Sequence, residues 1–349
     1  RYSQYHQYLY HRRLLVTHLK ILYGLHIMQR DEVKEIIACL DSERTIFHYF
    51  KDRYCFDLIE FYMDREGKDF LTIGELKKSS LSRLLPKELV RNALNHCGNG
   101  KLNKSDLKIF WPSETTPFVL TLNDWGDSDR GWDQTSRNQC NLVLQLNFNG
   151  FHIQEYNRLV KPNDHYRDGE GPFEYLGHPV CQEQRKTLSW VRMDIDFSTN
   201  EVLIEEIQND WLRKAKRKLQ AVKLRRLKRP TVKPNQVFAD IGAEYEDLQQ
   251  YVEQVLIPYQ SIWAEASMSA ALRFIRDELG ISTVFYHSFD TGKKIKAVCG
   301  SPPRSMYTQL PKQFGFESTQ ESPEFLMQDK VSRRYIKSIR DPHWFRLAV

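Results

Sequence analysis

The residues best suited to chemistry lie in the run EVLIEEIQNDW at positions 201–211. Its alternating apolar residues predict a β-strand, and this strand ends in carboxylates and amides that can transfer protons or form hydrogen bonds. Open α/β sheets bind ligands at the carboxyl ends of their strands. We therefore predict that Glu206, Gln208 and Asp210 belong to a catalytic or binding site.

Strand geometry limits which of these side chains share a site. Successive side chains of a strand point to opposite faces, so Glu205 is expected opposite Glu206, with Gln208 on the face of Glu206. The alternative interpretation is an exposed strand end at which Trp211 covers the core. Both interpretations remain open at the level of sequence.

A basic segment follows this strand. Residues 213–233 contain eleven basic residues and no acidic one, within a chain of net charge +6. Such a block either solvates an exposed helix or neutralises phosphates, and the sequence favours neither. It has no pattern for reading base edges, so binding would be through charge. The residues predicted to contact nucleic acid are Arg213, Lys214, Arg217, Lys218, Arg225, Arg226 and Arg229.

Two segments are similar to EF-hand calcium loops, at residues 64–75 and 95–106. The first has Lys68 at a ligand position and Asp69 where glycine normally makes the sharp turn, and the second has Cys97 at its third position. Calcium requires several oxygen ligands, and these loops offer too few. We predict a helix-turn-helix pair that binds no metal.

Composition excludes several classes of protein. The six cysteines are far apart and predict neither a zinc site nor a disulfide framework. No apolar run is long enough for a membrane helix, so we expect no membrane partner and a cytoplasmic location. The common nucleotide, hydrolase and zinc-protease motifs are absent. The sequence identifies no cofactor.

Hydrophobic periodicity predicts an α+β protein with two domains. Residues 1–112 are expected to form a helical domain, and residues 113–349 a mixed-sheet domain with a basic insertion at 212–234. Period-two patterns predict strands near residues 118–122, 142–148, 191–197 and 202–204. A polar loop is expected at 161–177, and helices at 211–228, 242–256 and 260–279. A further strand at 282–286 predicts a crossover, and the tail from 318 is expected to pack on the domain.

Residues 205–211 resemble the E-I-Q-S-D-W element of uncharacterised bacterial and phage proteins, including large multidomain proteins of mobile elements. In those proteins a helix with a tryptophan and then a strand follow the element. Trp263 and the strand at 283–287 keep this order. The resemblance implies a nucleic-acid-associated protein of a phage-conflict or mobile-element system.

The C-terminal half is similar to the GNAT acetyltransferase fold. The resemblance rests on residues 255–259, the following helix, Gly280, the strand after it, RSMY at 304–307 and FGFE at 314–317. It implies that Tyr307 protonates a thiolate leaving group, with His287 as a further proton-transfer residue. Residues 259–265 lack the glycine-rich turn on which acetyltransferases bind pyrophosphate, so the resemblance implies the fold more than the activity.

Three classes of function are compatible with the sequence. The first is a nucleic-acid-associated protein that binds through the basic segment. The second is an acyltransferase or other transferase with a cleft at Glu206 and Tyr307. The third is a non-catalytic scaffold with a protein partner. A co-purifying coenzyme would favour the second, and nuclease-sensitive co-purification the first.

Overall fold

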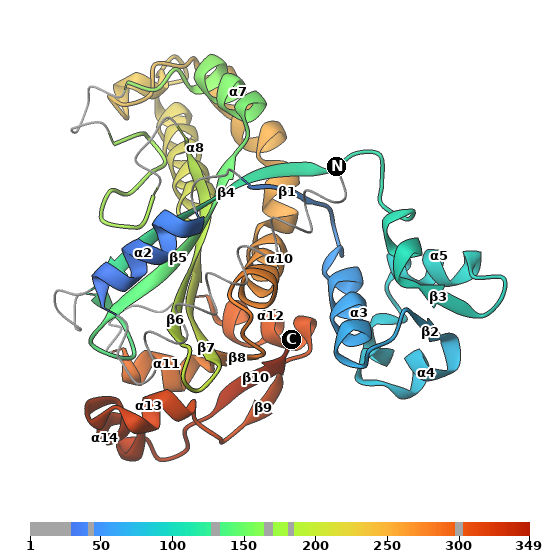
Figure 1. The fold of residues 1–349 in the computed structure, drawn as a ribbon. Helices are drawn as coiled ribbons and strands as arrows, with labels where there is room; N and C mark the ends of the chain where they lie inside the picture. Colours follow the sequence, from blue (N-terminus) through green and yellow to red (C-terminus); the bar gives the residue numbers. More distant parts are fainter. Residues whose placement is uncertain (1–28, 41–44, 127–132, 164–169, 181–184, 297–302) are drawn as a thin grey trace.

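The computed structural model describes residues 29–40, 45–126, 133–163, 170–180, 185–296 and 303–349 (Figure 1). Its centre is a mixed eight-stranded sheet of order β1-β4-β5-β6-β7-β8-β10-β9. Neighbouring strands are antiparallel except β7 and β8, which are parallel. The strands are β1 (Thr45–Tyr49), β4 (Thr116–Gly126), β5 (Cys140–Phe148), β6 (Thr187–Asp196), β7 (Glu201–Gln208), β8 (Thr283–His287), β9 (Glu317–Thr319) and β10 (Trp344–Ala348).

One face of the sheet carries the main hydrophobic core. Leu142, Leu144 and Leu146 of β5 alternate into it and are almost completely buried. The helices that contribute buried residues to this core include α2 (Arg30–Leu40), α3 (Tyr54–Arg65), α7 (Gly150–Val160), α8 (Trp211–Lys228), α9 (Tyr245–Gln250) and α10 (Ile257–Arg273). α8, α9 and α10 lie between β7 and β8, so the predicted crossover is confirmed.

The other face is polar near the middle of the sheet and apolar at one end. A smaller core there includes Leu203, Phe285 and Trp344, covered by α11 (Phe289–Ile295), α13 (Glu324–Gln328) and α14 (Lys330–Ser338). The C-terminal segment therefore packs on the sheet as predicted. α12 (Gln309–Phe314) precedes β9, and short 3₁₀ turns occur at Ser80–Leu84, Lys104–Lys108, Pro234–Gln236 and Arg304–Tyr307.

The predicted helical domain at residues 1–112 needs correction. β1 pairs along its length with β4 and is therefore part of the main sheet. α2 packs on β4 and β5, and Arg30 donates to Asp124 at 2.7 Å. The helical unit begins only at α3, because the aromatic and apolar run of residues 47–62 supplies both a strand and a helix. Residues 1–28 lie outside the described part of the chain.

The EF-hand-like segments form one paired unit. It consists of α3, α4 (Ile73–Lys78) and α5 (Glu88–His96), with the short strands β2 (Phe70–Thr72) and β3 (Lys101–Asn103). Leu71 pairs with Leu102, so the eighth positions of the two loops meet in an antiparallel ladder. α3 joins this unit to α10, where Arg273 binds Asp57.

Other predicted elements agree closely with the structure. The basic helix extends over Trp211–Lys228 and ends before Pro230, which cannot continue a helix. α10 continues as a π-helical turn, Phe274–Glu278, and the chain then turns at Gly280 with a φ of +62°. The described parts of residues 161–177 contain no helix or strand.

Candidate functional site at the carboxyl end of strand β7

A bulge changes the direction of the side chains in β7. Arg192 pairs with Glu206, whereas the next residue of β6, Met193, pairs with Ile204, so Glu205 is an extra residue. Ile204 and Ile207 both pack in the main core, although simple alternation would place them on opposite faces. Glu205 and Glu206 therefore both point away from that core, which corrects the predicted opposite orientation.

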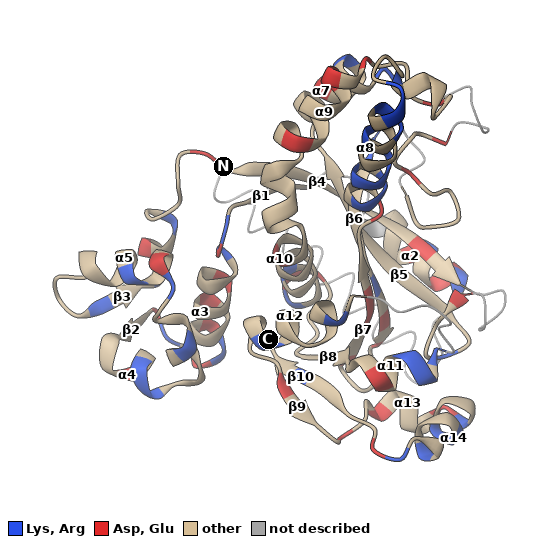
Figure 2. Ribbon diagram, turned by 180° about the vertical axis from the view of Figure 1, so that it is seen from behind, with Lys and Arg blue, Asp and Glu red and all other residues tan. Residues whose placement is uncertain are grey.

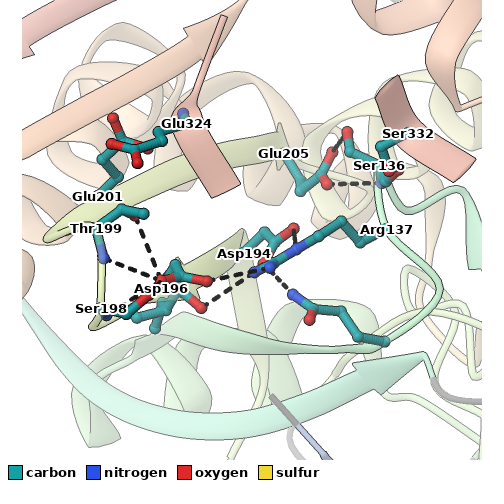
Figure 3. Close-up of polar contacts among 12 residues, drawn as sticks. Ser136, Arg137, Asp194, Asp196, Ser198, Thr199, Glu201, Glu205, Glu324 and Ser332 are labelled. Carbon is teal, nitrogen blue, oxygen red and sulfur yellow. Dashed lines mark hydrogen bonds and ion pairs between the residues drawn. The ribbon is translucent and has the colours of Figure 1, made fainter. Parts of the chain in front are cut away.

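Glu205 is the centre of a fully buried polar network, of which Figure 3 shows the contacts with Ser136. Its carboxylate accepts hydrogen bonds from the backbone N–H and the hydroxyl of Ser136, at 2.7 and 2.9 Å. The Nε2 atom of His287 lies 2.9 Å from Glu205 and 3.0 Å from the Ser136 hydroxyl. Burial alone would raise the pKa of Glu205, but His287 and nearby Lys296 outweigh it and lower the pKa to about 2.

Lys296 fills the space where β7 and β8 part. The pairing of these strands ends at Ile204 and Tyr286, and the Lys296 ammonium then donates to the Glu205 carbonyl at 2.6 Å. Burial lowers the pKa of Lys296, although Glu206 and Glu205 act in the opposite direction. A buried cation thus substitutes for strand pairing at the bulge.

A second buried network lies beside the first. Arg137 forms ion pairs with Asp194 at 2.6 Å and with Asp196 at 3.2 Å, and Figure 3 shows its guanidinium between the two carboxylates. Burial raises the pKa of Asp194 to about 6, against the opposing effect of Arg137. Ser332 of α14 donates to the Ser136 carbonyl at 2.8 Å, so the first network also holds α14 in place.

Glu206 forms an ion pair with Arg192, at 2.8 Å. The Arg192 side chain is 1% exposed and also donates to the carbonyls of Asp133 and Gln134. Burial would raise the pKa of Glu206, but Arg192 and Lys296 together lower it. Glu206 is therefore a partly exposed carboxylate held by a buried guanidinium.

The last two predicted site residues of this strand region meet at a histidine. The Nδ1 atom of His178 lies 2.5 Å from Asp210 and 3.1 Å from the Gln208 amide, which itself donates to Asp210 at 3.0 Å. Arg213 binds the other oxygen of Asp210. The His178 side chain is 25% exposed, whereas that of Asp210 is 6% exposed. Burial would raise the pKa of Asp210, but the hydrogen bond from His178 outweighs it and lowers the pKa.

Aromatic rings surround His178. Tyr175, Trp190 and Trp125 lie with their ring centroids 4.6, 5.6 and 6.3 Å from it, all edge-to-face. The Arg192 guanidinium lies 5.3 Å from the Trp125 ring, which links this cluster to Glu206. Glu206, Gln208 and Asp210 therefore contribute to one continuous surface at the end of β7.

The other two predicted catalytic residues lie elsewhere. His287 contacts Glu205 and is fully buried. Tyr307 is 6% exposed, and its ring stacks on that of Tyr286 with a centroid distance of 5.6 Å. Burial raises the pKa of Tyr307, and the negative charge of Glu206 raises it further. Tyr307 is thus electrostatically coupled to Glu206, but neither residue forms a hydrogen bond or ring contact with His178.

The predicted nucleic-acid-binding residues of α8 divide into two groups. Four of them have acidic partners: Arg213 with Asp210, Lys214 with Glu170, Lys218 with Asp240 and Arg226 with Glu246. Lys223 and Lys233, which were not singled out, also pair with acids, Glu253 and Glu244. The Lys218–Asp240 pair is largely buried and stabilises the fold, whereas the pairs of Arg226 and Lys233 are exposed and contribute little.

The second group has no acidic partner within the described residues. It comprises Lys216, Arg217, Arg225, Lys228 and Arg229, all of which are exposed. In Figure 2 the ribbon of α8 is coloured blue, for Lys and Arg, over much of its length. Ala215, Leu219 and Val222 are buried on the opposite side, so these five cations form an exposed strip, which we call the α8 strip.

Several residues of the site were not identified from the sequence. His178 lies in a loop without periodicity, and Trp125, Trp190 and Arg192 are single residues in strands whose partners come from distant segments. The one sequence feature that could have indicated His178 is its position near the aromatic residues Phe173 and Tyr175 in a polar loop. Such a signal is weak, because most histidines in loops have no partner that orients them.

Two hollows lie apart from this site. One of about 420 Å³ separates α3 from β9 and β10 and is lined by Arg65, Arg83 and Arg346 among others. Another of about 440 Å³ includes Asp64 and Arg276. Neither contains a predicted site residue.

The described residues contain no group of three or more His, Cys, Asp or Glu that could hold a metal ion. None of the helices in the described ranges combines the length and apolar character needed to cross a bilayer. No protein-family model, curated protein or solved structure matches the chain.

Proposed function

We propose that this protein binds nucleic acid, or a polyanion of similar charge density, along the α8 strip. The observation that supports this proposal is that five exposed cations have no acidic partner among the described residues, whereas six neighbouring cations of the same segment are paired with acids. Unpaired cations on one face of a helix attract phosphates and release their counterions. The resemblance of residues 205–211 to phage and mobile-element proteins is compatible with nucleic acid as the polyanion.

The two groups of cations provide a matched comparison. A first variant replaces Arg217, Arg225 and Arg229 of the α8 strip with glutamine. A second replaces the paired cations Lys223, Arg226 and Lys233 with glutamine. Both variants lower the net charge from +6 by three, to +3. A difference between them therefore depends on position rather than on total charge.

Binding is measured by fluorescence anisotropy with two unrelated oligonucleotides at several salt concentrations. We expect wild-type affinity to fall steeply with salt and to differ little between sequences, because the contacts are to phosphates. The first variant should lower the salt slope by up to about 0.9 per lost duplex phosphate contact, and the second by much less. Absence of wild-type binding at about 50 mM salt, where screening is weak, would contradict the proposal.

An acyltransferase is the second candidate. The observation that favours it is the parting of the parallel strands β7 and β8 after Ile204, beside the buried Tyr307. A coenzyme that entered between these strands would have to displace the Lys296 side chain, which fills the space in this structure. The test is thiol release from an acyl-coenzyme A in the presence of amine acceptors, with Tyr307→Phe as the control; no release with any acceptor would contradict this candidate.

A further inference from the structure

His178 has the geometry of an oriented proton-exchanging residue. Asp210 and Gln208 both contact its Nδ1 atom, so the ring position is fixed from one side. Its Nε2 atom has no hydrogen-bond partner in the described part of the chain, and the side chain is one quarter exposed. A carboxylate on one ring nitrogen stabilises the imidazolium, whose second N–H then points outward.

A buried donor lies next to this imidazole. Trp190 is 2% exposed, its ring lies 5.6 Å from His178, and its indole N–H finds no acceptor in the described ranges. A buried donor without an acceptor costs free energy, so such donors are rare in folded proteins. The polar groups around His178 are therefore incompletely satisfied within the described residues.

The charges that face His178 are balanced in pairs. Asp210 lies against Arg213, Glu206 against Arg192, and Lys214 against Glu170. Protonation of His178 therefore adds one positive charge beside these three balanced pairs. Arg213 belongs to the first turn of α8, one helical turn before Lys216 and Arg217 of the α8 strip.

We propose that His178 is a protonation-controlled phosphate-binding residue, positioned by Asp210 and Gln208, for the strand that the α8 strip binds. In the imidazolium form, Nε2–H donates a charge-assisted hydrogen bond to a phosphate oxygen, and neutral His178 does not. The protein then holds a phosphate-bearing strand more tightly as pH falls. This inference rests on the proposed polyanion-binding function.

The test compares wild type with His178→Gln, which cannot change its charge. Anisotropy titrations with a single-stranded oligonucleotide are made at pH 6 and pH 8, on either side of the usual titration of histidine. His343→Gln, at an exposed histidine elsewhere, serves as the control for non-specific protonation. Histidine-selective NMR with the same oligonucleotide reports directly whether the His178 ring contacts it.

We expect wild type and His343→Gln to bind several-fold more tightly at pH 6, with a salt slope larger by about 0.7, equivalent to one further phosphate contact on a single strand. His178→Gln should lose that increment and keep the binding seen at pH 8. Equal pH dependence in wild type and His178→Gln, or an unshifted His178 resonance in the complex, overturns this inference and leaves the proposed function in place. No binding at either pH and low salt overturns both.

Discussion

Lys68 donates a hydrogen bond to Glu75 at 2.7 Å, which places an ammonium group at the last coordinating position of the first EF-hand-like loop. Lys104 of the second loop forms an ion pair with Asp64, which is the first position of the first loop. Both carboxylates that a calcium ion would need are therefore neutralised within the protein. The hydrogen bonds from Lys68 and Thr72 lower the pKa of Glu75 to about 2.

These ion pairs lead to a prediction about calcium. Wild type should show no calcium binding tighter than about 10⁻⁴ M, because a cation would have to displace two lysines and would still lack ligands. The double variant Lys68→Ala with Lys104→Ala removes both lysines, although Asp64 keeps its ion pair with Arg276, and it should bind calcium more tightly than wild type. Isothermal titration calorimetry measures both, and tight wild-type binding would show that the lysines move aside.

Glu206→Gln tests whether the carboxylate at the end of β7 contributes to the stability of the fold as well as to a site. The sequence alone predicts a variant with nearly unchanged stability. The ion pair with Arg192, which is 1% exposed, leads us instead to expect a loss of about 1–3 kcal/mol in the free energy of unfolding, since a buried cation loses its charged partner.

The control for this experiment is Glu253→Gln, at an exposed ion pair with Lys223. Exposed pairs contribute little, so its loss should stay below about 1 kcal/mol. Urea unfolding followed by circular dichroism gives both values. If Glu206→Gln is as stable as wild type, the hydrogen bonds from Arg192 to the Asp133 and Gln134 carbonyls are enough to stabilise the buried guanidinium.

Local sequence predicts the elements of this fold better than it predicts their partners. α8 agrees with the expected bounds because apolar spacing and Pro230 are local signals. The bulge at Glu205 could not be predicted, since it depends on the pairing of Arg192 with Glu206 across two strands. The orientation of Glu205 was therefore predicted wrongly.

The same limit applies to the charges. In sequence, Lys218 and Arg217 are equivalent members of one basic run, and only the fold brings Asp240 to the first of them. His178 meets Asp210 across thirty-two positions of the chain. Long-range partners decide which cations are structural and which stay available, and a single sequence contains no record of these contacts.

The buried His152 leads to a prediction of how the free energy of unfolding changes with pH. Burial lowers the pKa of His152 to about 3, and its ring stacks on Phe148 and contacts the Tyr251 hydroxyl. The folded pKa is thus below the usual value near 6.5, so the unfolded chain binds a proton that the folded chain excludes. The stability that this histidine contributes is present above about pH 6.5 and falls as pH falls toward 3.

For His152 this linkage corresponds to a loss of about 2 kcal/mol between pH 7 and pH 5. His152→Gln keeps a hydrogen-bonding group and does not titrate, so it should lose this part of the pH dependence. Denaturant titrations at the two pH values measure the difference. The same loss in variant and wild type would show that His152 can be protonated within the fold.

The last prediction separates the structural cations of α8 from those of the α8 strip. Lys218 pairs with Asp240 and lies 4.7 Å from the Phe238 ring, with a side chain only 16% exposed. Lys218→Gln leaves the carboxylate of Asp240, 6% exposed, without its cation. We expect a loss of about 1–3 kcal/mol in unfolding free energy and little change in oligonucleotide affinity.

Arg217→Gln is the matched variant at the neighbouring position. Its side chain is exposed and has no ion pair with any described residue, so stability should stay within about 0.5 kcal/mol of wild type. Its oligonucleotide affinity should fall at low salt and converge with wild type at high salt, because a phosphate contact is lost. If Arg217→Gln binds like wild type while Lys218→Gln binds weakly, the polyanion contacts the other side of the helix, and the α8 strip is only a solvated face.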